Sequence, residues 1–138
     1  MPFCCRVGDS IFLNDKGGGH RYVVISEPNQ YKCVVIVNFT TASGSIDRTV
    51  TFTRSDDKNL FDHPTNVNFK LARIISTEKL ICEANRQDTV NHYISCSVDI
   101  VKRIVIGAFQ SQFTPIEIIE ELGIQYPDYY NKHYETDF

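Results

Sequence analysis

Long apolar runs are absent from this sequence, and none approaches the ~20 residues that a helix needs to cross a bilayer. The opening segment, MPFCCRVGDS, lacks the basic and apolar stretches of a secretory signal peptide. No repeat of the length found in solenoids or propellers occurs. We therefore expect a cytoplasmic protein that has no membrane partner and forms a single domain over residues 1–138.

Cysteine occurs in no pattern that favours a metal site. The five cysteines are an odd number, and no two are separated by the short gap of a zinc site. We expect neither a metal ion nor another cofactor. Cys33 and Cys82 stand in apolar segments and are expected to be buried. Cys4 and Cys5 are adjacent, which leaves redox sensitivity as an alternative.

The net charge of −3 is unevenly distributed along the chain. Residues 1–114 contain 13 Lys and Arg against 11 Asp and Glu, a balance of +2. Residues 115–138 contain only Lys132 against six acids, a balance of −5. A mildly basic body permits a local site for a polyanion. The acidic tail either covers such a site or aids solubility.

Short strands are predicted across the first two-thirds of the chain. Apolar alternation and β-branched residues favour them, with turn signals such as Glu27-Pro28-Asn29 between them. The predicted strands are 10–13, 22–26, 32–40, 48–54 and 67–75. Short strands joined by tight turns are typical of a small antiparallel barrel, here over residues 7–76.

Helical periodicity replaces this pattern in residues 77–123. Three segments carry helix caps or an apolar stripe: a short turn at 78–82, a helix from 97 to 109 and a helix from 114 to 123. Ser97 is a suitable N-cap residue, and Thr114 begins a capping box. The acidic, tyrosine-rich tail 124–138 is expected at the surface or partly mobile. The fold class is therefore mostly β with C-terminal helices, an antiparallel barrel plus two or three α-helices.

A glycine loop at 17–19 leads directly into His20, Arg21 and a strand. Glycine lets the backbone bend sharply and lie close to a ligand, and the strand holds the basic pair rigidly. Because neighbours on a strand point to opposite faces, His20 and Arg21 share one groove only if the loop twists the backbone. The alternative is a hairpin tip that carries two polar residues.

The segments GDSIFLND, GGGHRYVVISEPNQY and VVIVNFTT follow one another in an order that resembles the PemK/MazF-like toxins, and NVNFKLARIIS resembles a late strand of that family. The resemblance covers residues 7–76. It implies an SH3-like barrel, a homodimer and the toxin of a toxin–antitoxin system. The implied activity is that of a metal-independent endoribonuclease that cleaves single-stranded RNA, and the implied protein partner is an antitoxin.

The same resemblance implies a set of site residues. Arg21 aligns with the family's catalytic arginine, and Thr40 and Thr41 align with its threonine or serine pair. His20 falls near a histidine that some members use for catalysis. Arg21 would bind the scissile phosphate, because its guanidinium can donate hydrogen bonds to two phosphate oxygens and stays charged. His20 would assist proton transfer. The predicted RNA contacts are Lys16, Gly18, Gly19, Arg48 and Arg73.

Two other functions compete with the nuclease. A non-catalytic SH3-like module would keep the barrel and bind RNA, DNA or a protein. A regulatory protein would instead dock its helices, residues 97–138, on a partner enzyme.

His63 follows Asp62 and precedes Pro64, so that we expect it in a rigid turn, with a role in a second site as the alternative.

Overall fold

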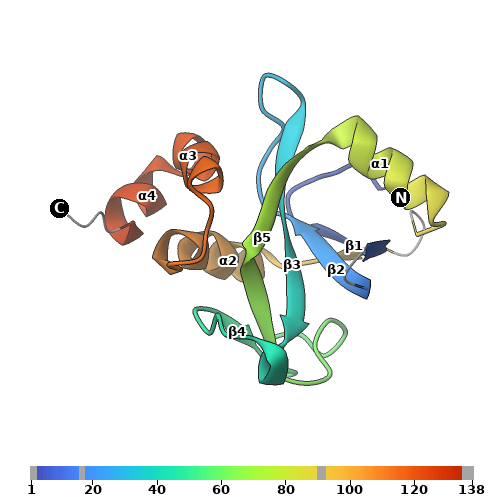
Figure 1. Cartoon of the computed structure of the whole chain (residues 1–138), viewed down its shortest axis with the longest axis horizontal. Helices are drawn as coiled ribbons and strands as arrows, with labels where there is room; N and C mark the ends of the chain where they lie inside the picture. Colours follow the sequence, from blue (N-terminus) through green and yellow to red (C-terminus); the bar gives the residue numbers. More distant parts are fainter. Residues whose placement is uncertain (1–2, 16–17, 90–92, 135–138) are drawn as a thin grey trace.

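The computed structural model describes residues 3–15, 18–89 and 93–134. Its centre is an antiparallel sheet in the order β4-β5-β3-β2-β1-β6 (Figure 1). The strands are β1 (Asp9–Asp15), β2 (Gly18–Val24), β3 (Cys33–Thr41), β4 (Thr51–Phe52), β5 (Thr65–Ser76) and β6 (Ile94–Ser95). The prediction of a mostly antiparallel, β-rich fold with helices after the main strands is confirmed.

Helices cover both faces of the sheet. The helices of the described residues are η1 (Ala42–Gly44), α1 (Thr77–Arg86), α2 (Val98–Gln110), α3 (Ile116–Gln125) and α4 (Pro127–His133). Figure 1 shows α2, α3 and α4 on one side of the sheet and α1 on the other. We expected two or three α-helices, and the described ranges contain four. The additional one is α4, where Tyr126, Tyr129 and Tyr130 pack against the core, so this part of the predicted tail is anchored.

β3 separates two hydrophobic cores. Val35 and Val37 belong to the larger core, which includes the buried faces of α2 and α3. Val34 and Ile36 point the other way, into a smaller core closed by Leu80 of α1. A strand that is buried on both faces reads as a continuous apolar run, which is why this segment is rich in valine and isoleucine.

The sheet curls because β5 bends where it pairs with β3. Ile36 lies opposite Arg73 and Asn38 lies opposite Asn68, so one residue of β3 faces four residues of β5, 69–72. Extra residues on one strand bend it and increase its twist. The result is a curled half-barrel. Within the described residues β4 and β6 each pair with a single neighbour, so the pairing there does not close the predicted barrel.

Two local predictions are wrong at their boundaries. The strand expected at 48–54 is reduced to β4, because the carboxylate of Asp47 binds the backbone N–H and the hydroxyl of Thr49, at 3.1 and 2.7 Å, and forms a turn. The short turn expected at 78–82 is the first half of α1. Cys82 is therefore exposed on a helix rather than buried, and Cys33 is only half-buried.

Candidate nucleic-acid interface

Arg21 lies on β2 with its guanidinium directed towards β1. Its Nη1 donates to Ser10 Oγ at 3.1 Å and to the Ser10 carbonyl at 3.4 Å. The side chain is half-buried, and this burial lowers the pKa of its guanidinium. Because β1 and β3 flank β2 on opposite sides, the guanidinium extends away from Thr40 and Thr41 of β3. The structure therefore does not gather Arg21 and the threonine pair around one hollow.

His20 lies on the opposite face of β2 from Arg21, as expected for neighbours on a strand. Its ring meets the ring of Tyr22 edge to face, with 6.5 Å between the centroids. Tyr22 belongs to the smaller core, whereas Arg21 shares the face of Val23, which belongs to the larger core. The loop does not twist His20 and Arg21 into one groove.

Thr40 and Thr41 are also divided between the faces of β3. Thr40 lines a small hollow of about 180 Å³ together with Asn68 and Lys70. Thr41 is exposed, and its Oγ1 lies 3.3 Å from Nε2 of His63. The predicted threonine pair thus has one member beside a cation and the other beside an imidazole.

The remaining predicted contacts serve different purposes. Gly18 has a φ of +101°, a conformation that favours glycine. A Cβ on Gly19 would lie 2.3 Å from the ring of Phe12, so this glycine makes room for a neighbouring side chain. Arg48 is exposed in the turn held by Asp47. Lys16 lies outside the described residues.

Arg73 lies in a groove of about 590 Å³ between the sheet and α1, which we call the basic groove. Its three cations are Arg73, Lys79 and Arg86. The guanidinium of Arg73 lies over the ring of Tyr22, with Cζ 5.5 Å from the centroid. Such a cation–π contact limits where the guanidinium can point. The apolar part of the lining is Leu13, Ile74 and Ile75.

Glu83 contributes a carboxylate to the basic groove, and both of its oxygens already accept hydrogen bonds. Arg86 donates to both of its oxygens, and Gln87 Nε2 donates to Oε1 at 2.8 Å. The hydrogen bonds from Arg86 and Gln87 lower the pKa of this carboxyl to about 2. The described lining contains one acidic side chain, Glu83, and three cationic ones, so the groove carries an excess of positive charge.

Sequence reasoning selected Arg73 but missed Tyr22 and the other charged residues of the groove, Lys79, Glu83 and Arg86. Lys79, Glu83 and Arg86 are spaced by four and three residues, which places them on one face of a helix. A helix prediction that continued past residue 82 would have found them. Tyr22 of β2 and Arg73 of β5 lie on the two strands that flank β3, and no local signal shows their contact.

No protein-family model, curated protein or solved structure matches this chain. Within the described ranges, no helix is both long and apolar enough to cross a membrane. In the same ranges, no group of three or more His, Cys, Asp and Glu side chains could hold a metal ion. The functional assignment therefore rests on the grooves and their chemistry.

Proposed function

We propose that this protein binds single-stranded RNA in the basic groove. The observation that carries the proposal is the convergence of Arg73, Lys79 and Arg86 on one hollow, with Arg73 oriented by Tyr22. Phosphates are the dominant source of affinity for nucleic acid, and lysine and arginine neutralise them. Arginine also bonds two phosphate oxygens at once or stacks on a base.

The apolar lining favours a single strand over a duplex. Ile74 and Ile75 lie beside the cations, and Ile74 is 38% exposed. Unstacked bases of a single strand have apolar faces that such side chains can contact, whereas a duplex turns these faces inward. The motif resemblance to PemK/MazF-like toxins supports the same ligand, and with it the SH3-like barrel, the homodimer and the antitoxin as parts of this proposal.

Binding is tested with a labelled mixed-sequence RNA strand by fluorescence anisotropy, in chelator and over a series of salt concentrations. The double variant Arg73→Gln/Lys79→Gln should bind more weakly, and the slope of log K against log salt should fall by about 0.7 for each lost phosphate contact. The matched control is Arg54→Gln/Lys58→Gln, which removes the same charge from an exposed loop. Equal weakening by both double variants would refute a site in the basic groove.

A second function, metal-independent cleavage of RNA, is favoured by the contact between Thr41 and His63. In this reaction the 2′-hydroxyl oxygen attacks the adjacent phosphorus, His63 accepts its proton, and the bond to the 5′-oxygen breaks, with water protonating the leaving oxygen. The products are a 2′,3′-cyclic phosphate and a 5′-hydroxyl. Purified protein should cut RNA in chelator, His63→Ala should not, and the control His133→Ala should cut normally. No cutting by the wild type leaves the non-catalytic module as the function.

A further inference from the structure

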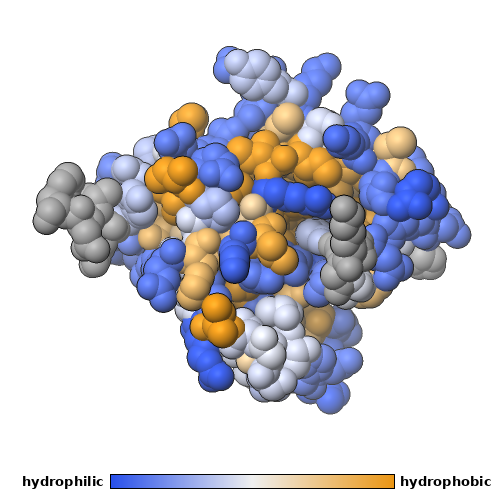
Figure 2. All heavy atoms as spheres, in the orientation of Figure 1, coloured by the Kyte–Doolittle hydropathy of each residue, from blue (hydrophilic) through white to orange (hydrophobic). Residues whose placement is uncertain are grey.

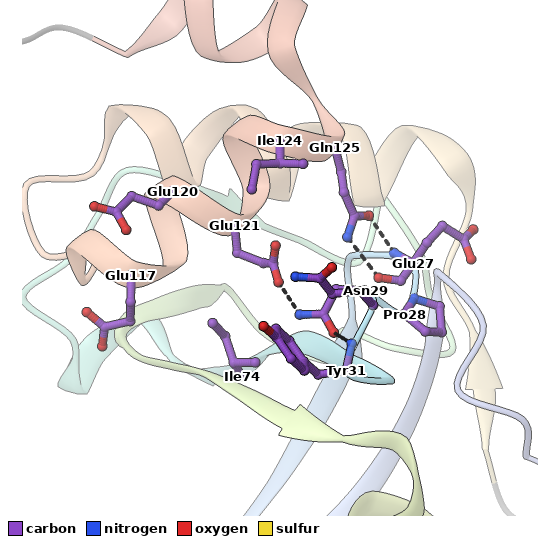
Figure 3. Close-up of a pocket in the computed structure, with 11 residues that line it drawn as sticks. Glu27, Pro28, Asn29, Tyr31, Ile74, Glu117, Glu120, Glu121, Ile124 and Gln125 are labelled. Atoms are coloured by element: carbon purple, nitrogen blue, oxygen red, sulfur yellow. Dashed lines mark hydrogen bonds between the residues drawn. The ribbon is translucent and has the colours of Figure 1, made fainter.

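A second groove lies between α3 and the turn that joins β2 to β3, and we call it the acidic groove (Figure 3). Its volume is about 900 Å³. Residues 27–31 form one wall, α3 forms the other, and Ile74 of β5 lies between them. Ile74 also lines the basic groove, so the two grooves adjoin.

The acidic groove exposes large apolar side chains. Tyr31 is 74% exposed, Ile124 is 76% exposed and Ile74 is 38% exposed. Figure 2 shows apolar atoms at the surface over β3 and β5, between α3 and α1, with hydrophilic atoms around them. Apolar groups that gather in a hollow with a polar rim are typical of a surface that a partner covers.

The charged side chains in the described lining of the acidic groove are all acidic. Four glutamates line the groove, Glu27, Glu117, Glu120 and Glu121, and its described lining contains no lysine or arginine. Neither of the two ion pairs in the described residues involves any of them. Glu117 and Glu121 are four residues apart on α3, a spacing of like charges that weakens a helix. An external cation would remove this repulsion.

The walls of the acidic groove are fixed by hydrogen bonds. Gln125 binds the backbone N–H and carbonyl of Glu27, at 2.7 and 2.8 Å. Asn29 Oδ1 accepts from the backbone N–H of Tyr31 at 2.8 Å, and Asn29 Nδ2 donates to Glu121. A groove held in this way needs little rearrangement to bind, which favours affinity.

We propose that the acidic groove binds a basic amphipathic helix of a partner protein. Its apolar side chains would contact Ile124, Ile74 and Tyr31, and its lysines and arginines would face Glu117 and Glu120. Helices of this kind commonly lie in grooves with an apolar floor, and the acidic rim selects a basic one. RNA is repelled by the same carboxylates, so this protein-binding site goes beyond the proposed RNA binding.

The test uses a labelled helical peptide of lysine and leucine, with leucine on one face, and a scrambled peptide of the same composition. Fluorescence anisotropy should show tighter binding of the amphipathic peptide. Glu117→Gln/Glu120→Gln should weaken it about three- to tenfold, as expected when two exposed ion pairs are lost. Ile124→Ser should weaken it about tenfold or more, because a buried isoleucine contact is lost.

Matched variants separate this proposal from general charge effects. Asp62→Asn/Glu78→Gln removes two exposed carboxylates elsewhere and should leave peptide affinity unchanged. Arg73→Gln/Lys79→Gln should weaken RNA binding without weakening peptide binding, so that failure of RNA binding and failure of peptide binding are distinguishable. Equal binding of the scrambled peptide would overturn the proposal. The proposal would also be overturned if sedimentation experiments showed a dimer that Ile124→Ser abolishes, because a second copy of the protein would then cover the acidic groove.

Discussion

Gln125 binds Glu27 through the backbone of the turn rather than through its carboxylate. Gln125 Oε1 accepts from the Glu27 N–H at 2.7 Å, and Nε2 donates to the Glu27 carbonyl at 2.8 Å. Gln87 of α1 makes the same pair with Asn14 of β1, at 2.7 and 2.9 Å. In both cases the amide of a glutamine at the end of a helix satisfies backbone groups as a neighbouring strand would, and fastens the helix to a turn or strand beside it.

Gln125→Leu should therefore destabilise the protein. The substitution removes two exposed hydrogen bonds, and because water can replace these partners at Glu27 the loss is about 1 kcal/mol. Urea unfolding should show a lower midpoint with an unchanged slope. Gln112→Leu, at an exposed position between α2 and α3, is the control and should unfold like the wild type. An equal shift in both variants would show that the paired hydrogen bonds contribute nothing.

Gly107→Ala should destabilise the protein although alanine favours helices. A Cβ at residue 107 would lie 2.2 Å from Val50 Cγ2 and 3.1 Å from Phe69 Cζ, because α2 packs closely on the sheet at this point. Overpacking of this kind costs about 1–3 kcal/mol, which outweighs the stabilisation expected from the higher helix propensity of alanine. Thermal unfolding measures the difference. Gly44→Ala meets no atom within 4 Å and should keep its melting temperature.

Four of the five cysteines should react in two groups. Cys4 and Cys82 are exposed, whereas burial raises the pKa of Cys5 and Cys96 to about 12 and so disfavours their reactive thiolates. Iodoacetamide on the native protein, followed by tryptic digestion and mass spectrometry, should add one group to the peptide MPFCCR and none to Cys96. In denaturant the peptide should gain two groups and Cys96 one. Rapid labelling of Cys96 in the native protein would contradict its burial.

Sequence patterns located most of the sheet because apolar alternation follows burial directly. β1, β2, β3 and β5 lie within a few residues of their predicted positions. β4 and β6 have two residues each, too short for a period to appear. Asp47 shortened the strand predicted at 48–54 through side-chain hydrogen bonds to Thr49 and Ser111. The contact with Thr49 is a local turn, whereas the contact with Ser111 joins distant segments and leaves no mark in the local pattern.

The candidate site was less predictable than the fold. The opposite faces of His20 and Arg21 follow from strand geometry and were expected unless the loop twisted the chain. The basic groove, however, needs α1 to cover the sheet and β5 to pair with β3, so that Arg73 meets Tyr22 of β2. These are tertiary relationships between distant segments. A prediction from residue types therefore selected Arg73 but not its neighbours.

Stability should fall in acid through Glu83. Hydrogen bonds from Arg86 and Gln87 lower the pKa of the Glu83 carboxyl from 4.5 to about 2. A carboxyl whose pKa is lower in the folded state stabilises that state above its unfolded pKa, and this contribution is lost as the pH falls through the folded pKa. Between pH 4.5 and about 2, the free energy of unfolding should therefore decrease less steeply in Glu83→Gln than in the wild type.

The matched control for this pH dependence is Glu78→Gln, which removes an exposed carboxyl from the first turn of the same helix. Glu78 accepts none of the hydrogen bonds that hold Glu83, so its variant should keep the steep acid slope of the wild type. Urea unfolding followed by circular dichroism at several pH values measures these slopes. Parallel pH profiles for Glu83→Gln and the wild type would mean that Glu83 loses its partners in solution, and that Arg86 carries an unpaired charge in the basic groove.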